Sequence, residues 1–387
     1  MRVLLAMHNA LLYGAARSML NHALALREHG VEFAVLLPQH GPLEEVLEAQ
    51  GIPRYVFPLE HFGLKKAPLQ KGGPGKLARA AASRWRFFRG ASRAMEELGR
   101  PIVHLHSTFC GHAALAARAA RCPILWHVRE ERHRSVEKRA PSPRLWVSQL
   151  WVEMRRRNAR RWADRVVYVS HAVQKKYGLP EKRSDVVYNF IRMPSEPPPR
   201  PAGGPLRVLH AGRVTIEKGA EEFLAICRAA SRRGVDLVAT YAGEGPAPYV
   251  EDYRRRIRED GLEDRLLLPG YVTDMAPLYA ASDVLLFPSH TEALPRAVME
   301  AMAYGRPVIA SDAGGIPEMI ESGRTGFIFD LHHPEAAVDA LEALARDPAR
   351  RAEMGRLARE RARRLFSQES YVEQMLRIYR EMEAARG

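Results

Sequence analysis

The sequence predicts an α/β protein of two doubly wound domains, each a mostly parallel sheet with helices on both faces. The 387 residues exceed the roughly 250 to 300 at which a single hydrophobic core stops growing. Short apolar runs rich in Val, Ile and Leu alternate with helical stretches on both sides of one Pro- and Gly-rich segment. Such apolar strands, separated by helices, are typical of parallel sheets that are buried on both faces.

The first domain is predicted to span residues 1–193, followed by a linker at 194–205. In the linker sequence, PSEPPPRPAGGP, the clustered Pro and Gly can form neither a helix nor a central strand. Six apolar runs are the expected strands of this domain: 2–7, 31–38, 101–107, 123–128, 165–170 and 185–190.

The second domain is predicted at 206–366, with a last amphipathic helix at 367–387 that could pack back on the first domain. Ligands of open parallel sheets bind at the carboxyl ends of the strands, so two facing domains should hold a ligand in the cleft between them. The expected strands of the second domain are 206–213, 235–243, 265–270, 283–289, 307–311 and 326–330.

The composition is that of a globular chain. With 46% hydrophobic and 27% charged residues, it excludes collagen, mucin and bulk disorder. The three cysteines form no CxxC pair, which argues against a disulfide scaffold or a zinc ribbon and favours a reducing compartment. The N-terminal apolar run is too short for a signal peptide, and no run approaches the roughly 20 residues that cross a bilayer. We therefore expect a cytoplasmic protein, with peripheral association at the inner face of the plasma membrane as an option.

Positive charge is concentrated in the first half of the chain. Residues 1–190 hold 32 basic and 15 acidic side chains, against 27 and 30 in the remainder. Most of the excess lies in residues 61–99 and 132–165, which also contain aromatic side chains such as Trp85 and Trp151. These segments fit an anionic membrane surface or an anionic acceptor. Equally, the aromatic side chains could pack on the sheet while the arginines are only solvated.

The segment from 289 to 318 is the richest in candidate site residues. After the expected strand at 283–289, a loop ending at Leu294 leads to Pro295, which suits the first position of a helix. The free amides of the helix start, at Arg296, Ala297 and Val298, could bind a phosphate with help from the helix dipole.

Charged side chains around this loop fit a sugar nucleotide. Glu292 and Glu300 could accept hydrogen bonds from the hydroxyls of a sugar or a ribose. Arg213 and Lys218 follow the expected strand at 206–213 and could offset the charge of a diphosphate. Two glycines at 314 and 315 would let the backbone approach the ligand closely.

In the first half, Gly14 follows the first strand and precedes a helix, which makes it another close-approach site for phosphate. His127 ends the expected strand at 123–128 and is either a site residue or a hydrogen-bonded core histidine. His104 and His106 form an HxH pair, but no further ligand lies near them in the sequence, so we expect no metal site there.

Taken in order, several segments resemble family 4 glycosyltransferases: GR at 212–213, EKG at 217–219, AGEGP at 242–246, PGYV at 269–272, the glutamates at 292 and 300, EAMAYGRPVIAS and GGIPE. The resemblance covers nearly all of residues 206–330 and is weaker over 1–190. It implies the GT-B fold, in which two Rossmann-like domains face each other across a cleft.

The resemblance also implies roles for individual residues. Arg213 and Lys218 match the family's diphosphate-binding pair, Glu292 the residue near the donor sugar, and Glu300 the residue that holds the ribose. The implied catalytic set is completed by His127, which resembles a histidine beside the donor sugar. The remaining donor-binding positions are Gly14, Tyr271, Val272, Leu294, Arg296 and Ala297.

Two positions depart from the family pattern. Where many members have a Gly-Gly pair, this sequence has Gly14 followed by Ala15, and Pro295 cannot donate the N–H that some members offer to the sugar.

The expected activity is retaining transfer of a sugar from a nucleotide diphosphate-sugar to a hydroxyl acceptor, in cell-envelope lipid or polysaccharide synthesis. The acceptor could be lipid-linked or anionic. No cofactor and no metal are expected, because no DxD sequence stands on a loop to hold one and the two cations can act in its place. One alternative is a sugar-nucleotide epimerase or hydrolase of the same fold. Another is a basic nucleic-acid-binding protein, although no RNP motif, helix-turn-helix or zinc finger is present, so we expect no nucleic-acid partner.

Overall fold

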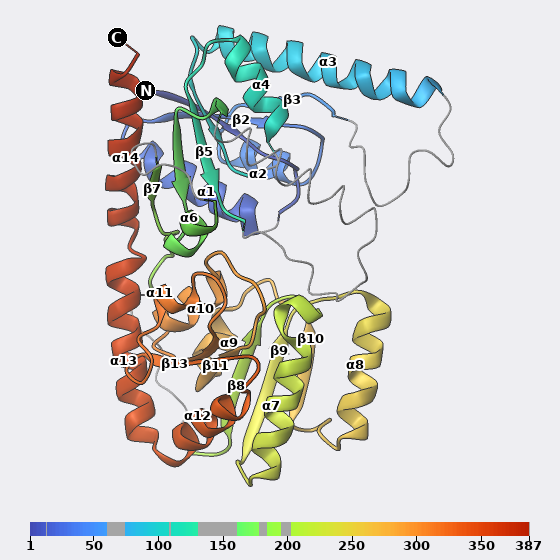
Figure 1. Cartoon of the computed structure of the whole chain (residues 1–387), viewed down its shortest axis with the longest axis vertical. Helices are drawn as coiled ribbons and strands as arrows, with labels where there is room; N and C mark the ends of the chain where they lie inside the picture. The colour runs from blue at the N-terminus through green and yellow to red at the C-terminus, as the bar shows by residue number, and fades with distance from the viewer. Residues whose placement is uncertain are drawn as a thin grey trace.

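Two parallel sheets, one in each half of the chain, form the cores of two domains stacked along the long axis of the molecule (Figure 1). The computed structural model describes residues 1–12, 14–59, 74–107, 110–130, 161–177, 184–194 and 203–386. Of the expected linker, residues 195–202 lie outside this described part. None of the described helices is both long enough and apolar enough to cross a bilayer.

The N-terminal sheet has the strand order β3-β2-β1-β4-β5-β6-β7. The predicted strands all form, but β7 is shorter than predicted, and the edge strand β3 was not predicted because its three residues carry no apolar run. The strands are β1 Arg2–Ala6, β2 Glu32–Leu37, β3 Arg54–Val56, β4 Ile102–Leu105, β5 Ile124–Val128, β6 Arg165–Tyr168 and β7 Ser184–Val186. The helices are α1 Gly14–Arg27, α2 Leu43–Ala49, α3 Pro74–Glu97, α4 Gly111–Ala119 and α6 His171–Tyr177.

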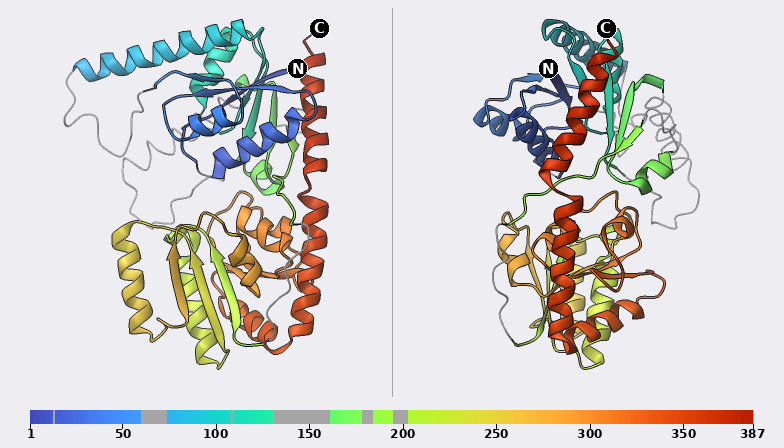
Figure 2. Two further views of the ribbon diagram at one scale, coloured as in Figure 1. Left: turned by 180° about the vertical axis from the view of Figure 1, so that it is seen from behind. Right: turned by 90° about the vertical axis from the view of Figure 1, so that its left-hand side faces the viewer.

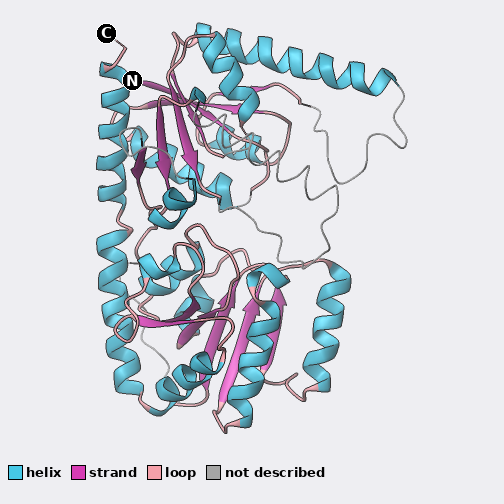
Figure 3. Cartoon of the chain, in the orientation of Figure 1, coloured by secondary structure: helices cyan, strands magenta, loops and turns pink. Residues whose placement is uncertain are grey.

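The C-terminal sheet repeats this arrangement with the order β10-β9-β8-β11-β12-β13. Its strands are β8 Leu206–Ala211, β9 Leu237–Ala242, β10 Leu266–Gly270, β11 Val284–Phe287, β12 Val308–Ser311 and β13 Gly326–Phe329. A short 3₁₀ helix, η2 Ile216–Lys218, precedes the helices α7 Ala220–Arg232, α8 Ala247–Glu259, α9 Ala276–Ala281, α10 Arg296–Ala303, α11 Ile316–Met319 and α12 Glu335–Arg346 (Figure 3).

In both sheets the chain order reverses at one place, between β1 and β4 and between β8 and β11. Loops leaving two such strands diverge to opposite sides of the sheet, which opens a crevice at their carboxyl ends. The two switch points are therefore where a ligand site is expected.

The last two helices, α13 Pro348–Leu365 and α14 Gln368–Ala384, run along one side of both domains (Figure 2). Ser367 begins α14, and its side chain accepts a hydrogen bond from the amide of Ser370. The apolar face of α14 packs against α1 and β4, with Tyr371 and Tyr379 buried. The end of the chain therefore becomes part of the N-terminal core.

The basic segments predicted to contact a membrane or an acceptor are described only in part, because residues 60–73 and 131–160 lie outside the described chain. In α3 the aromatic side chains divide between two environments: Phe87 is buried, whereas Trp85 is 57% exposed with Arg89 stacked 4.6 Å from its ring centre.

Candidate functional site

The ion pair of Lys218 and Glu292 joins the two loops at the C-terminal switch point. Lys218 follows β8 through η2, and Glu292 follows β11, the neighbouring strand. The Lys218 Nζ lies 2.5 Å from the Glu292 carboxylate, and the Ser289 hydroxyl donates to the same oxygen at 2.9 Å. Sequence analysis assigned both residues to the site but did not predict that they pair.

Gly219 allows the loops after β8 and β11 to come into close backbone contact. It has a φ of +76°, and a Cβ there would lie 1.9 Å from the carbonyl oxygen of Pro288, at the end of β11. Only glycine suits both the left-handed conformation and the contact. The glycine of the EKG segment therefore seats Lys218 against the loop that carries Glu292.

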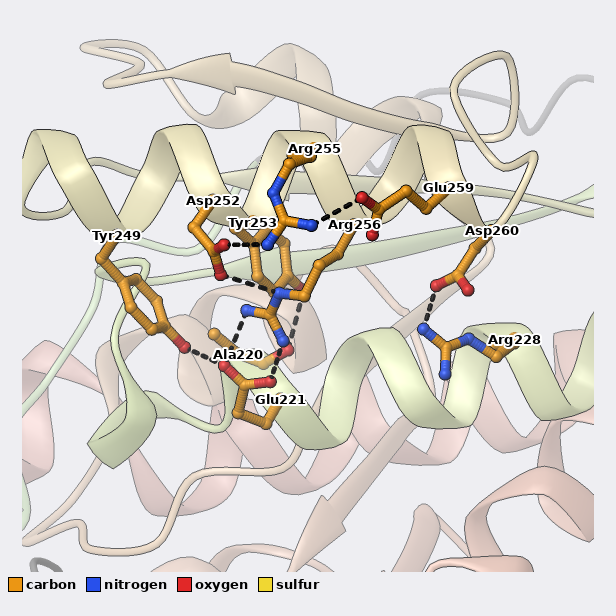
Figure 4. A network of polar contacts seen from close by, with 10 residues as sticks. All are labelled: Ala220, Glu221, Arg228, Tyr249, Asp252, Tyr253, Arg255, Arg256, Glu259 and Asp260. Carbon is orange, nitrogen blue, oxygen red and sulfur yellow. Dashed lines mark hydrogen bonds and ion pairs between the residues drawn. The ribbon is translucent and has the colours of Figure 1, made fainter.

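Ala220 and Glu221, which follow Lys218 and Gly219, are held by hydrogen bonds from side chains of α8 (Figure 4). The Tyr253 hydroxyl donates to the Ala220 carbonyl at 2.7 Å, and Arg256 donates to the Glu221 carboxylate at 2.5 Å. The hydrogen bond from Arg256 lowers the pKa of Glu221. The first turn of α7 is thus fixed, and with it the end of the loop that bears Lys218.

Helix α10 begins one residue later than predicted. Pro295, expected at the first helical position, is the N-cap, since its ψ of 123° places it in extended backbone. The first intrahelical bond runs from the amide of Met299 to the carbonyl of Pro295 at 3.3 Å. The three amides before it, those of Arg296, Ala297 and Val298, have no acceptor in the helix and point out of its N-terminus.

Glu300 lies one turn inside α10 and is held by two partners. The Tyr279 hydroxyl donates to it at 3.0 Å and the Arg296 guanidinium at 2.9 Å. Burial, and then the charge of Glu300, raise the pKa of Tyr279, so this hydroxyl stays a donor. Glu292 and Glu300 therefore have separate partners and can bind separate parts of one ligand.

Four further predicted donor contacts differ in their exposure to solvent. Arg213 is exposed directly after β8, and no carboxylate of the described chain pairs with it. Tyr271 is 57% exposed after β10, and Arg17 of the N-terminal domain donates to its hydroxyl at 3.1 Å. Val272 beside it is half-buried. Leu294 is buried in the core, which leaves its main chain as the part that can face a ligand.

The glycines at 14 and 315 have different surroundings. Gly14 is exposed at the start of α1, and a Cβ there would meet nothing within 4 Å. A Cβ on Gly315 would lie 2.3 Å from the carbonyl oxygen of Ala293 and 3.0 Å from Ser170. Gly315 therefore allows the close contact between the two domains. We had predicted that it would allow the backbone to approach a ligand.

His127 is buried at the carboxyl end of β5. Its Nδ1 lies 3.2 Å from the Nε2 of His104 and 3.3 Å from the Arg129 guanidinium. Its Nε2 is also buried and has no hydrogen-bond partner among the described residues. Burial, followed by the charge of Arg129, holds the pKa of His127 well below its ordinary value, so the ring is neutral near pH 7.

The structure adds residues near His127 that sequence analysis missed: His22, Arg129, Tyr371 and Tyr379. They lie on α1, after β5 and on α14, and hydrogen bonds link them to His104 and His127. Arg129 stands two residues after His127 but belongs to no motif, and His22, Tyr371 and Tyr379 are far from His127 along the chain. The HxH pair at 104 and 106 was therefore the one signal of this group in the sequence.

Two family models match this chain. The model described as Glycosyltransferase Family 4 matches residues 13–193, and the one described as Glycosyl transferases group 1 matches residues 205–347. Together they cover both domains. The chain belongs to the family 4 glycosyltransferases, as the sequence segments predicted.

Curated relatives match over part of their length. The chain is 31% identical over 177 residues to an alpha-D-kanosaminyltransferase of Streptomyces kanamyceticus, a match that covers 45% of each chain. It is 34% identical over 163 residues to a D-inositol 3-phosphate glycosyltransferase of Pseudarthrobacter chlorophenolicus, covering 41% of this chain and 39% of that one. In both cases the match spans less than half the length of the relative.

Solved structures match over the whole chain. HepE of Anabaena in complex with UDP has a TM-score of 0.79 at 20% identity, over 98% of this chain and 100% of that one. The same protein in complex with UDP-glucose has a TM-score of 0.77 at 20% identity, with the same coverage. The fold is GT-B, with two Rossmann-like domains, as predicted.

Proposed function

We propose that this protein is a retaining glycosyltransferase that moves a sugar from a nucleotide diphosphate-sugar to a hydroxyl acceptor. The observation that carries the proposal is the meeting of the Lys218–Glu292 pair with the loop before α10 at the C-terminal switch point. A cation, a carboxylate and free helix amides are the groups that a charged, hydroxyl-rich ligand requires. The relatives named as glycosyltransferases and the fold shared with a UDP-glucose complex support it.

In this proposal each group has one task. The amides at the start of α10, with Arg213 and Lys218, bind the diphosphate and stabilise the charge that grows on the departing nucleotide. Glu300 accepts hydrogen bonds from the ribose, and Glu292 accepts them from the sugar. Tyr271, exposed and next to the interdomain contact with Arg17, lies beside the base.

For the reaction itself, the acceptor hydroxyl attacks the anomeric carbon on the face from which the diphosphate leaves. A phosphate oxygen of the leaving group takes the proton of that hydroxyl, so no protein base is required. His127 lies beside the sugar. Arg213 and Lys218 supply the positive charge that a metal ion supplies in other enzymes.

We place the acceptor against the N-terminal domain, whose basic side chains favour an anionic or lipid-linked molecule. The described face of α3 carries the exposed Trp85 with Arg86 and Arg89 around it, the composition of a surface that contacts anionic headgroups. This supports a role in cell-envelope lipid or polysaccharide synthesis at the inner face of the plasma membrane.

The test begins with thermal shifts against UDP, GDP and ADP and their sugar conjugates, with and without magnesium. A ligand of the native state raises the melting temperature by mass action. We expect one base to give a magnesium-independent shift that Glu300→Ala abolishes. The absence of a shift with every nucleotide would contradict the proposal.

Turnover is then measured with that donor, following product and anomeric configuration by NMR. Lys218→Ala should lower transfer on the order of 100-fold, because it removes a charge that stabilises the leaving group. Lys175→Ala, at an exposed lysine of α6, is the matched control. Conversion of the donor without acceptor would instead favour an epimerase or hydrolase.

A further inference from the structure

Five hydrogen bonds and one further polar interaction, between Tyr371 and Arg129, form a ring that connects the C-terminal helix to His127. Its members come from α1, β4, β5 with the residue that follows it, and α14, and the histidines and tyrosines are all buried. Following the ring from β5, they are Arg129, His127, His104, Tyr379, His22 and Tyr371. Because one member can only donate, the direction of every bond can be deduced.

Arg129 is the member that can only donate. A guanidinium has no acceptor, so its 3.3 Å contact makes the Nδ1 of His127 the accepting atom. A neutral imidazole that accepts at Nδ1 carries its proton at Nε2. The Nε2 of His104, 3.2 Å from the same Nδ1, must then be a donor as well, and the two donors share one acceptor.

The rest of the ring follows. With its proton at Nε2, His104 accepts at Nδ1 from the Tyr379 hydroxyl at 2.6 Å. That hydroxyl has no second proton, so toward His22 it accepts from the Nε2–H at 2.9 Å. The Nδ1 of His22 then accepts from the Tyr371 hydroxyl at 2.8 Å. The Arg129 guanidinium and the Tyr371 hydroxyl also interact, which returns the path to its starting residue.

These hydrogen-bond directions hold only if the three imidazole rings are neutral, and burial keeps them neutral. Burial comes first among the causes that hold the pKa values of His22, His104 and His127 well below the ordinary value, and the charge of Arg129 lowers all three further. Each ring therefore carries one proton, and every proton in the ring has a single acceptor.

We propose that Tyr371 and Tyr379 of α14 are positioning residues: they fix His104 as the second donor to the Nδ1 of His127, and so support Arg129 in keeping the proton of His127 on Nε2. That Nε2 is buried and has no partner in the described part of the chain, so the ring presents it as a donor for an incoming acceptor atom. The acceptor atom would be a hydroxyl or ring oxygen of the donor sugar, an assignment that rests on the proposed function. The last helix, which carries none of the predicted site residues, thereby holds one of the two donors that keep a site residue in its tautomer.

The same region contains a group of histidines that resembles a metal site. One nitrogen from each of His22, His104 and His106 lies within 4.8 Å of the others. Both nitrogens of His22 and both of His104 are already engaged in the ring, and only the nitrogens of His106 have no hydrogen-bond partner among the described residues. A metal ion would have to break the ring, so the two interpretations are exclusive.

The first experiment reads the tautomer directly. Protein labelled with ¹⁵N-histidine is compared near pH 7 by long-range ¹H–¹⁵N correlation NMR, with the signals assigned from His104→Gln and His127→Gln variants. We expect a single Nε2–H tautomer at both residues in the unchanged protein. In Tyr379→Phe the donor to the Nδ1 of His104 is lost, so a mixture of tautomers should appear at His104, whereas Arg129 still donates to His127. Tyr168→Phe removes a buried hydroxyl from neighbouring β6 and should leave both tautomers unchanged.

The second experiment tests the consequence for the reaction. Tyr379→Phe and Tyr371→Phe should each lower kcat/KM for the donor sugar about tenfold, the size expected for one weakened hydrogen bond. Affinity for the nucleotide alone should not change, because His127 faces the sugar. Tyr371→Phe breaks the ring at its far end and keeps the test available if Tyr379→Phe does not fold.

The outcomes separate the two proposals. An Nδ1–H tautomer of His127 in the unchanged protein, or a His104 tautomer unaffected by both tyrosine substitutions, would overturn the ring, as would zinc in the purified protein that perturbs the histidine signals. A single Nε2–H tautomer of His104 that the substitutions convert to a mixture, in a protein that transfers no sugar, would support the ring and refute the proposed function.

Discussion

At the scale of single residues, close backbone contacts position the charged groups of the site. Gly219 is the sharpest case, because its left-handed conformation and its contact with Pro288 both exclude a side chain. Lys218 is its immediate neighbour. A change at Gly219 should therefore act on stability and on nucleotide binding together.

We predict that Gly219→Ala lowers the free energy of unfolding by more than about 2 kcal/mol, since it adds a steric clash to the strain of a left-handed alanine. The matched control is Gly234→Ala, at a φ of +80° with nothing within 4 Å of the added Cβ. This control should cost only about 1 kcal/mol and leave binding of the nucleotide found in the thermal-shift screen intact. Urea unfolding and calorimetric titration measure both effects, and equal losses in the two variants would refute the steric argument.

At the scale of elements, α6 is capped by a side chain of the other domain. The Glu318 carboxylate of α11 accepts from the amides of His171 and Ala172 at 2.9 and 2.7 Å, and from the Tyr188 hydroxyl at 2.9 Å. Burial, and then the charge of Glu318, raise the pKa of Tyr188. The glutamate of the GGIPE segment thus links the domains away from the Lys218–Glu292 pair.

We predict that Glu318→Ala weakens the contact between the domains by about 1–2 kcal/mol, the value of a helix cap that also carries charge. Small-angle scattering should show a wider distribution of domain arrangements, and calorimetry a broader unfolding transition. Tyr188→Phe removes one of the three hydrogen bonds and should have a smaller effect. Scattering and unfolding curves that match the unchanged protein would show that the cap does not couple the domains.

At the scale of the whole molecule, five buried histidines of the described residues make stability depend on pH. Burial is the main cause that lowers their pKa values, to about 3 for His210 and well below 6.5 for the others. The unfolded chain takes up these protons below its pKa of 6.5, and the folded chain does not. Stability is therefore fully present above pH 6.5 and is lost as the pH falls. The histidines are His22, His104, His106, His127 and His210.

Between pH 6.5 and 5.5 each of these groups should cost about 1 kcal/mol of unfolding free energy. His290 acts in the opposite direction, because a hydrogen bond to Glu222 raises its pKa, but it is one group against five. We expect the melting temperature to fall steeply over this interval, and His210→Gln to reduce the slope. A melting temperature constant from pH 7.5 to 5.5 would contradict the buried neutral state.

The sequence by itself determined the alternation of strands and helices, the presence of two parallel sheets and the family, and it predicted donor residues in the second half. These features are local: an apolar run, the loop after it and the start of the next helix lie within about 30 residues of each other. The N-cap position of Pro295 and the edge strand β3 were missed because element boundaries depend on one or two residues of backbone geometry.

Only the tertiary structure decided which distant side chains meet. The ring that sets His127 joins residues 22 and 104 to residues 371 and 379, and no spacing along the chain encodes such contacts. The pairing of Lys218 with Glu292 and the cap of α6 by Glu318 likewise arise from strand order and from the contact between domains. Sequence patterns record which face of an element is apolar, whereas the partner of a buried polar atom is chosen by the packing of elements from far along the chain.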